Sequence, residues 1–150
     1  SSTNTIGTFL NGEYLTSYVD SSYSSMIEDN TTWYLGTVGS GSSYSYKNAK
    51  YTDASGTTTT SNVTQARVGL LRYGELMSGQ FDRYGNNTFY WTLTPKSSSD
   101  VRRVNDLGSA GSIRPSFANG VRPSMNLKSS VQITSGTGTE SDPFVLTLGS

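Results

Sequence analysis

The chain has 150 residues, with 11 acidic and 11 basic side chains and neither cysteine nor histidine. Without thiols or imidazoles, the sequence excludes a disulfide framework, a zinc site of cysteine and histidine, a cysteine nucleophile and a Ser-His-Asp triad. Only 15% of the residues are charged, whereas 16 are glycine and 10 are tyrosine. Because tyrosine suits pleated strands and glycine suits turns, this composition predicts a strand-rich fold with many turns.

Length and charge distribution limit the organisation and the partners. A chain of this length predicts a single domain over residues 1–150. Residues 1–46 hold four acidic and no basic residues, whereas residues 96–128 hold six basic and two acidic ones. This asymmetry favours either head-to-tail attraction or ordinary surface patches. The basic residues lie among serines without a basic helix, so nucleic acid is not an expected partner. No apolar run reaches the length of a membrane span, and any export signal is expected upstream.

The first regular elements are predicted in residues 8–28. Apolar side chains recur there every four residues, for example at Leu10, Tyr14 and Tyr18, which places them on one face of a helix. Asp20 interrupts the pattern and is followed by two serines. This break favours a new N-cap and two short helices over one long helix.

The middle of the chain is predicted to contain short elements and one long excursion. A strand is expected at residues 32–35 and a buried strand at 66–71, with one or two helical turns at 73–77. Residues 36–64, rich in glycine, serine and threonine, predict a long loop or a weak hairpin. Glu75 and Asp82 are an acid pair that suggests glycoside hydrolysis, although a surface or helix-terminal role for Glu75 is the favoured interpretation.

Residues 89–127 are predicted to contain most of the sheet. An aromatic strand begins at 89–91, a turn follows Pro95, and further elements are a strand at 101–104, a Gly/Ser loop at 108–112 and a closing strand at 121–127. Polar residues lie mainly in the turns between apolar strand positions, as in a binding surface mounted on a rigid sheet. Alternation places Arg102 on one face of its strand and Arg103 with Asn105 on the other.

The C-terminal residues 131–148 are predicted to form a β-hairpin. Two strands, at 131–134 and 144–148, flank a glycine-containing turn. The Gly-x-Gly-x-x-x-Asp pattern in this turn resembles a calcium loop, but its two carboxylates fall short of an EF-hand. No metal site and no cofactor are therefore predicted.

Several phrases, taken in order, resemble a domain found in exported and prepilin-type surface proteins of Gram-positive bacteria. The phrases are TFLNGEYLTSYVDSSYSSMI, TWYLG, ARVGLLRYGELMSGQ, YWTLTPKSSSDVRRVN and NGVRPSMNLKSSVQITSGTGTESDPFVL. That domain is similar to the C-type-lectin-like fold of formylglycine-generating-enzyme relatives and of retroelement variable proteins. The resemblance covers residues 8–148.

The resemblance implies an α+β fold in which two short helices flank a twisted, mainly antiparallel sheet with long loops. The strand that contains residues 119–123 would close this sheet, and ligands would meet the face made by residues 90–117. It also implies an extracellular location at the cell surface. The cysteines and the EPN and WND signatures of many lectins are absent, so calcium-dependent sugar binding is not carried over.

Three functions follow as hypotheses. The first is a noncatalytic extracellular ligand-binding or adhesion domain that meets a protein or glycan on another surface. Tyrosine, serine, glycine and asparagine supply adaptable contacts of this kind. Both tryptophans are expected in the core. The predicted contact residues are Lys96, Ser98, Asp100, Arg102, Asn105, Asp106, Arg114, Phe117 and Asn119.

The other two hypotheses come from different classes. A structural subunit would self-associate into a filament or surface layer through its oppositely charged regions. A carboxylate-dependent glycosidase would use Glu75 with Asp82 or Asp100.

Overall fold

The computed structural model describes residues 5–34, 63–78, 87–97 and 99–149. The excursion predicted for residues 36–64 lies outside this part of the chain except for its last two residues, and so does Asp82. The chain divides into two compact units. The first comprises Ser1–Thr31, Ala66–Val68 and Met125–Ser150, and the second comprises Thr32–Gln65 and Gly69–Ser124.

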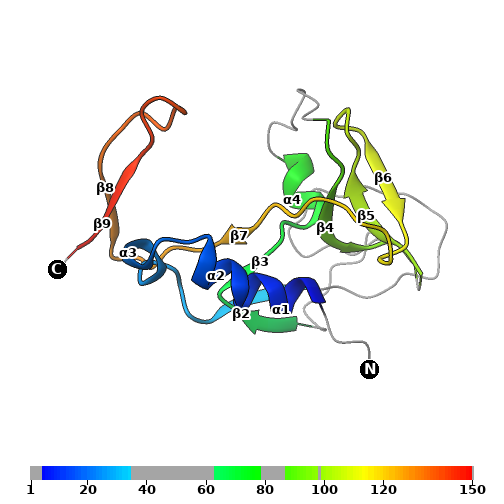
Figure 1. Ribbon diagram of the computed structural model, residues 1–150, viewed down its shortest axis with the longest axis horizontal. Helices are drawn as coiled ribbons and strands as arrows, with labels where there is room; N and C mark the ends of the chain where they lie inside the picture. The colour runs from blue at the N-terminus through cyan, green and yellow to red at the C-terminus, as the bar shows by residue number, and fades with distance from the viewer. Residues whose placement is uncertain (1–4, 35–62, 79–86, 98, 150) are drawn as a thin grey trace. The chain divides into compact units, whose positions relative to one another are not determined.

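Three short helices open the first unit (Figure 1): α1 (Thr5–Asn11), α2 (Glu13–Ser17) and α3 (Ser21–Ser24). The break predicted at Asp20 is confirmed, because Asp20 is the N-cap of α3 and its carboxylate accepts the Ser22 N–H at 2.8 Å. A second break at Gly12 divides the first predicted helix. A Cβ at Gly12 would lie 2.9 Å from the Thr8 carbonyl oxygen, so the close passage of the chain requires glycine.

The first unit has its own apolar core. Its buried hydrophobic residues are Leu10, Leu15, Met26, Ile27 and Val68. The helical pattern was expected to reach residue 28, but α3 ends at Ser24. Ile27 instead forms an antiparallel bridge with Leu127. Burial of a whole Leu or Ile side chain contributes about 1.5–3 kcal/mol, so these positions stabilise the unit.

Asn11 explains why the single strand predicted at residues 66–71 is divided into β2 (Val63–Ala66) and β3 (Val68–Gly69). The Asn11 Oδ1 accepts the backbone N–H groups of Arg67 and Val68, each at 3.0 Å. Its Nδ2 donates to the Val68 carbonyl at 2.9 Å. The side chain thus supplies the backbone hydrogen bonds that the bend at Arg67 would otherwise leave unmade. β2 pairs with β1 (Thr31–Tyr34), and β3 pairs with β7 (Ser124–Met125).

The C-terminal strands β8 (Val131–Ser135) and β9 (Val145–Leu148) form an antiparallel pair in the segment where the sequence predicts a hairpin. Their turn requires glycine. Gly138 has a φ of +77°, and a Cβ there would lie 2.5 Å from the Phe144 ring. The Asp142 carbonyl accepts the N–H groups of Thr137 and Gly138 at 3.1 and 3.0 Å, which closes the loop.

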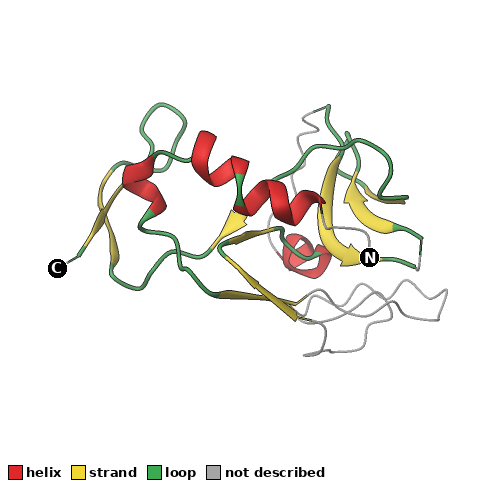
Figure 2. Ribbon diagram, turned by 60° about the horizontal axis from the view of Figure 1, so that its bottom comes forward, coloured by secondary structure: helices red, strands yellow, loops and turns green. Residues whose placement is uncertain are grey.

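A three-stranded antiparallel sheet organises the second unit, in the order β4 (Tyr90–Pro95), β5 (Val101–Val104) and β6 (Ala110–Ile113). These strands lie side by side in Figures 1 and 2. Its core includes both tryptophans, as predicted. The buried hydrophobic residues are Trp33, Leu70, Tyr73, Tyr90, Trp91 and Val104.

Two predictions for this region are wrong. The Gly/Ser loop expected at 108–112 ends earlier, because β6 begins at Ala110 and pairs with β5 from Val104↔Ala110 to Val101↔Ile113. The closing strand expected at 121–127 is reduced to the two residues of β7. Pro123 lies within that stretch and has no N–H to donate to a ladder.

The helix α4 (Tyr73–Ser78) confirms the helical turns predicted at 73–77. A hydrogen bond to a threonine hydroxyl holds it to β4. The Thr94 Oγ1 accepts the Tyr73 N–H at 2.8 Å in a buried position. Glu75 at the third helical position accepts the Arg72 N–H at 2.8 Å, which is one half of a capping box. Glu75 therefore has the helix-terminal role that the sequence favours.

The architecture confirms an α+β class with few, short helices and antiparallel strand pairs. Among the described residues the strands belong to four small sheets instead of the one sheet that was expected. No helix in the described part of the chain is long and apolar enough to cross a membrane.

Candidate functional site

The predicted contact residues of the second unit do not form one surface. Arg102 is the clearest correction, because only 6% of its surface is exposed. Alternation along β5 turns Arg102 and Val104 toward the interior, and the Arg102 carbonyl accepts a bond from the buried Thr92 hydroxyl at 2.9 Å. Ser98 lies outside the described residues.

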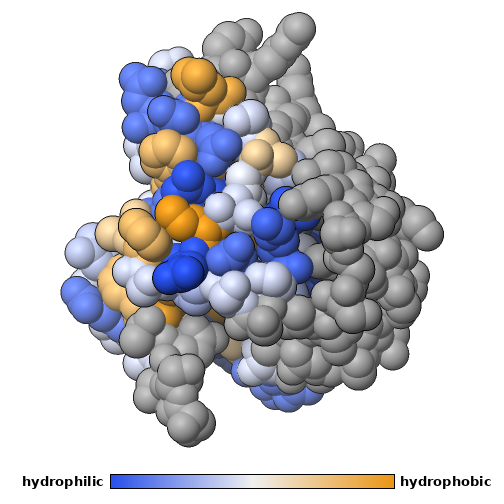
Figure 3. Space-filling model, turned by 90° about the vertical axis from the view of Figure 1, so that its right-hand side faces the viewer, coloured by the Kyte–Doolittle hydropathy of each residue, from blue (hydrophilic) through white to orange (hydrophobic). Residues whose placement is uncertain are grey.

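Five other predicted residues lie in turns. Lys96 and Asp100 pair across the β4–β5 turn at 3.9 Å. The Asp106 carboxylate accepts the N–H of the next residue at 3.0 Å. Arg114 and Phe117 lie in one exposed turn, closed by a bond from the Phe117 N–H to the Arg114 carbonyl at 3.1 Å. On the face drawn in Figure 3, hydrophilic and hydrophobic residues lie interspersed.

The remaining two predicted residues, Asn105 and Asn119, meet at Arg103. The Arg103 Nε donates to the Asn105 Oδ1, and its Nη1 donates to the Asn119 Oδ1, both at 3.2 Å. The guanidinium carbon lies 4.1 Å from the centroid of the Phe89 ring. We call Phe89, Arg103, Asn105 and Asn119 the Arg103 cluster. The alternation of β5 predicted that Arg103 and Asn105 share a face, whereas the contact with Asn119 was not predicted.

The sheet explains how the cluster is assembled. Arg103 pairs with Trp91 on one side and with Gly111 on the other. A Cβ at Gly111 would collide with the Asn105 amide, so glycine there leaves the space that this amide fills. Gly120 bonds to the start of β4, since its N–H donates to the Phe89 carbonyl at 2.7 Å. This bond places the neighbouring Asn119 beside Phe89.

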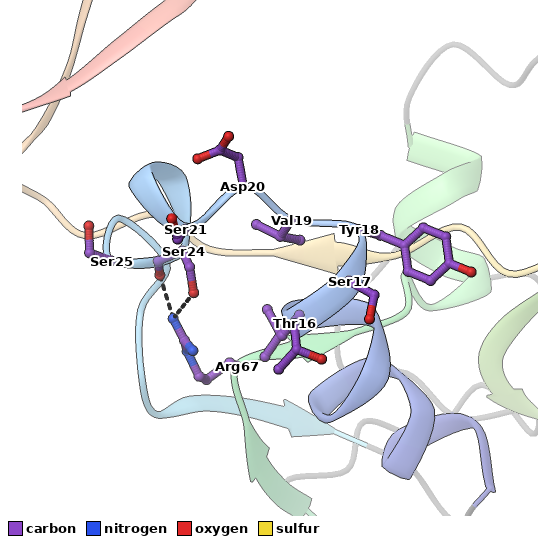
Figure 4. Close-up of a pocket in the computed structure, with 10 residues that line it drawn as sticks. Thr16, Ser17, Tyr18, Val19, Asp20, Ser21, Ser24, Ser25 and Arg67 are labelled. Atoms are coloured by element: carbon purple, nitrogen blue, oxygen red, sulfur yellow. Dashed lines mark hydrogen bonds between the residues drawn. The ribbon is translucent and has the colours of Figure 1, made fainter.

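The first unit contains a groove that the sequence did not predict (Figure 4). It has a volume of about 920 Å³ and lies between α2, α3 and Arg67. Its lining residues come from the helical break and the segments on either side of it. They are Leu15, Thr16, Ser17, Tyr18, Val19, Asp20, Ser21, Ser24, Ser25 and Arg67.

The groove combines hydroxyl groups with one exposed aromatic ring. Tyr18 is 67% exposed and stacks on Tyr14, with ring centroids 6.1 Å apart and an interplanar angle of 13°. Phe9 meets the Tyr18 ring edge-on at 6.3 Å. The two neighbours hold the Tyr18 ring while much of its surface stays open to solvent. Figure 4 shows this ring turned away from Arg67 and Ser24, so Tyr18 lies at the outer rim of the groove.

Charged groups at the groove are fixed by neighbours. Hydrogen bonds from the side chain and then the backbone of Ser22 stabilise the ionised carboxylate of Asp20 and lower its pKa. The Arg67 guanidinium points to Ser24 in Figure 4, and its Nη2 donates to the Ser24 carbonyl and, at 3.3 Å, to the Ser24 hydroxyl. Its Nε also pairs with Asp29 at 3.3 Å. Arg67 is thus a fixed wall of the groove.

A local signal for this groove exists in the sequence. Residues 16–25 alternate hydroxyl residues with Tyr18, Val19 and Asp20 around the predicted break. The apolar residues of this segment predict a buried helical face, and the hydroxyl residues beside the break lie outside that face. The contribution of Arg67 is a contact over 43 residues, which no local pattern indicates.

The described residues offer no cluster of three or more carboxylates that would suit a metal ion. No protein family, no curated protein and no solved structure was found to match the chain.

Proposed function

We propose that this protein is a noncatalytic extracellular ligand-binding or adhesion domain of a bacterial surface protein, with a C-type-lectin-like fold, and that its groove binds a saccharide. The location and the fold family rest on the sequence resemblance. The binding chemistry rests on the groove.

The composition of the groove lining carries this proposal. A sugar presents ring hydroxyls at its edge and C–H bonds on its faces, so it matches hydroxyl and carboxylate partners beside an exposed aromatic ring. Ser17 and Ser21 lie on either side of Asp20, and their hydroxyls form no hydrogen bond with any residue that the structure describes. Asp20 uses its Oδ1 for Ser22 at 2.8 and 2.6 Å. Its second oxygen is left for the hydroxyls of a ligand.

Binding without turnover is favoured because the groove lining contains one carboxylate, Asp20. Glycoside hydrolysis ordinarily needs a pair of carboxyl groups on either side of the scissile bond. Glu75, which the glycosidase hypothesis uses, is engaged in capping α4 instead.

A glycan array followed by calorimetry tests the proposal. We expect Tyr18→Ala to lower the affinity for the best-bound glycan by roughly tenfold, about 1.4 kcal/mol. The stability of the protein should be retained, because the ring is mostly exposed. Tyr23→Ala is the matched control, since Tyr23 is 44% exposed and lies outside the groove lining. Equal losses for the two variants, no bound glycan on the array, or a cleaved glycan detected by mass spectrometry would reject the proposal.

A second candidate, a subunit of an extracellular assembly, is favoured by the C-terminal hairpin. β8 and β9 carry no charged residue, and Ile133, Phe144, Val145 and Leu148 are 43–60% exposed. Unprotected strand edges of this kind tend to pair with other chains. Sedimentation at low and high salt tests this candidate. Assembly through the hairpin should persist at high salt and be lost in Ile133→Lys but not in Gln132→Lys, whereas a monomer under all conditions rejects it.

A further inference from the structure

We propose that the Arg103 cluster is a second binding site, specific for an oxyanion group of a ligand, with a carboxylate as the best match. The cluster belongs to the second unit, and the proposal does not depend on the groove in the first unit.

The charge of Arg103 is not compensated within the part of the chain that the structure describes. Arg67 and Lys128 pair with Asp29, and Lys96 pairs with Asp100. Arg103 has two amide oxygens and the Phe89 ring as its partners, all of which are neutral. An unpaired, half-buried cation is a favourable place for an anion, because partial burial weakens the screening by water and salt.

The guanidinium keeps donors for such an anion. The Nε and one Nη1 hydrogen serve Asn105 and Asn119, which leaves three of the five N–H groups of an arginine. Two of these belong to Nη2, to which neither asparagine bonds, and the third belongs to Nη1, so two neighbouring nitrogens each keep a donor. A guanidinium edge with a planar pair of donors matches the two oxygens of a carboxylate.

The orientation of the guanidinium is fixed before any ligand binds. The Asn105 Nδ2 donates to the Ser109 hydroxyl at 3.1 Å, which turns its Oδ1 toward Arg103. Gly111 leaves the space for this amide. The Phe89 ring supports one face of the guanidinium at 4.1 Å. A side chain held on three sides loses little conformational freedom when it binds a ligand.

Asn119 supplies an independent sign that the cluster is short of acceptors. Its Oδ1 faces Arg103, and the opposite amide orientation would bring two donors together. The Nδ2 is consequently buried without a hydrogen-bond partner among the residues that the structure describes. Buried donors are rarely left unmatched in folded proteins. The cluster therefore has an excess of donors as well as an excess of positive charge. A bound oxyanion would supply both the acceptors and the negative charge that the cluster lacks.

The test uses the full chain with oligogalacturonate as the carboxylate-bearing probe, a neutral dextran oligosaccharide as its uncharged counterpart, and free acetate. Calorimetry should detect the oligogalacturonate but not the dextran at this site, and the affinity should fall as salt increases. Arg103→Gln should reduce the affinity at least about tenfold. Arg114→Gln is the matched control, because it removes an exposed arginine of the same basic region, and it should reduce the affinity less than about threefold.

Two further variants separate binding from a purely structural role of Arg103. Asn119→Asp places a carboxylate of nearly the same shape beside the guanidinium, so it should abolish binding of the probe while the fold is retained. Gly111→Ala should displace the Asn105 amide and weaken binding with the charge unchanged.

The outcomes decide between a specific site and its alternatives. No binding of the probe to the wild type, equal losses for Arg103→Gln and Arg114→Gln, or full binding by a folded Asn119→Asp variant each overturns the proposal. If acetate binds and loses affinity in Arg103→Gln as the oligogalacturonate does, the carboxylate alone is the recognised group. If only the oligogalacturonate binds in a way that depends on Arg103, the saccharide also contributes contacts. Tyr18→Ala should leave these affinities unchanged, so a failure of the groove proposal is recognised separately.

Discussion

Removal of the Asn11 side chain is the most direct test of how the first unit is held together. In the wild type this side chain forms hydrogen bonds with the backbone of Arg67 and Val68, over 56 and 57 residues of sequence. Its Nδ2 also donates to the Gly7 carbonyl at 3.1 Å, within the same helix and exposed to solvent. The three long-range bonds lie at 2.9–3.0 Å, which is good geometry for N–H···O contacts.

The expected cost of Asn11→Ala follows from these bonds. Each hydrogen bond contributes about 1 kcal/mol net, and a buried partner left without a bond costs about 1–3 kcal/mol. The Val68 N–H and carbonyl are the partly buried groups that would lose their partner, while the exposed bond to Gly7 is replaced by water. We therefore expect the free energy of unfolding to fall by about 3 kcal/mol.

Urea unfolding is followed by far-UV circular dichroism instead of tryptophan fluorescence, because both tryptophans belong to the second unit and would not report on the first. Asn30→Ala is the matched control, since Asn30 is exposed and its side chain forms no hydrogen bond within the described part of the chain; it should change the free energy by less than about 0.5 kcal/mol. Asn11→Asp should lie between the two, because it keeps the acceptor and loses the donor. If Asn11→Ala unfolds at the same urea concentration as Asn30→Ala, the side chain does not stabilise the bend between β2 and β3.

Three further changes test local features. Gly138→Ala should destabilise the C-terminal hairpin by about 1–3 kcal/mol, because it combines a φ of +77° with a clash against the Phe144 ring; amide exchange in β8 and β9 measures this. Thr94→Val should cost about 1–3 kcal/mol in a thermal melt, because the first N–H of α4 loses a buried acceptor. The pKa of Asp20 is lowered by Ser22. The ionised carboxylate should therefore stabilise α3 fully above the ordinary pKa of aspartate, and this contribution should be lost as the pH falls through the lowered pKa. NMR titration of the Asp20 carboxyl carbon measures this pKa.

Local patterns predicted the elements whose causes are local. The spacing of apolar residues gave the helical face of the first residues, and Asp20 marked the break because its side chain caps the next turn. β5 was predicted at 101–104, and its alternation placed Arg102 and Arg103 on opposite faces, but Arg102 was wrongly assigned to the contact surface, since it is buried. These features depend on residues at most four positions apart, so a sequence pattern contains the information that fixes them.

The misses have a common physical origin in contacts between distant segments. β6 has the composition of a loop, but Gly111 belongs to a strand because β5 supplies its partners and Asn105 occupies the space beside it. Asn119 joins the Arg103 cluster because the next residue, Gly120, bonds to the start of β4. In each case the deciding partner lies on another strand or turn, and composition alone cannot identify it.

Amide and hydroxyl groups provide several fixed polar contacts in the described part of this charge-poor chain. Asn11 holds the bend at Arg67, Asn105 and Asn119 hold Arg103, and the Thr94 hydroxyl holds α4. The ion pairs at Asp29 involve a carboxylate side chain that is 68% exposed, so they contribute little and are screened by salt. The stability of the fold should accordingly depend weakly on ionic strength. Oxyanion binding at Arg103 should depend on it more than the stability does, because the anions of the salt compete with the free ligand for the same cation. A salt series that measures the free energy of unfolding and the affinity for the probe on the same sample therefore separates the two effects. If both fall together as salt increases, the loss of binding follows from a loss of the fold. If only the affinity falls, the site lies on a scaffold that is held together by neutral groups.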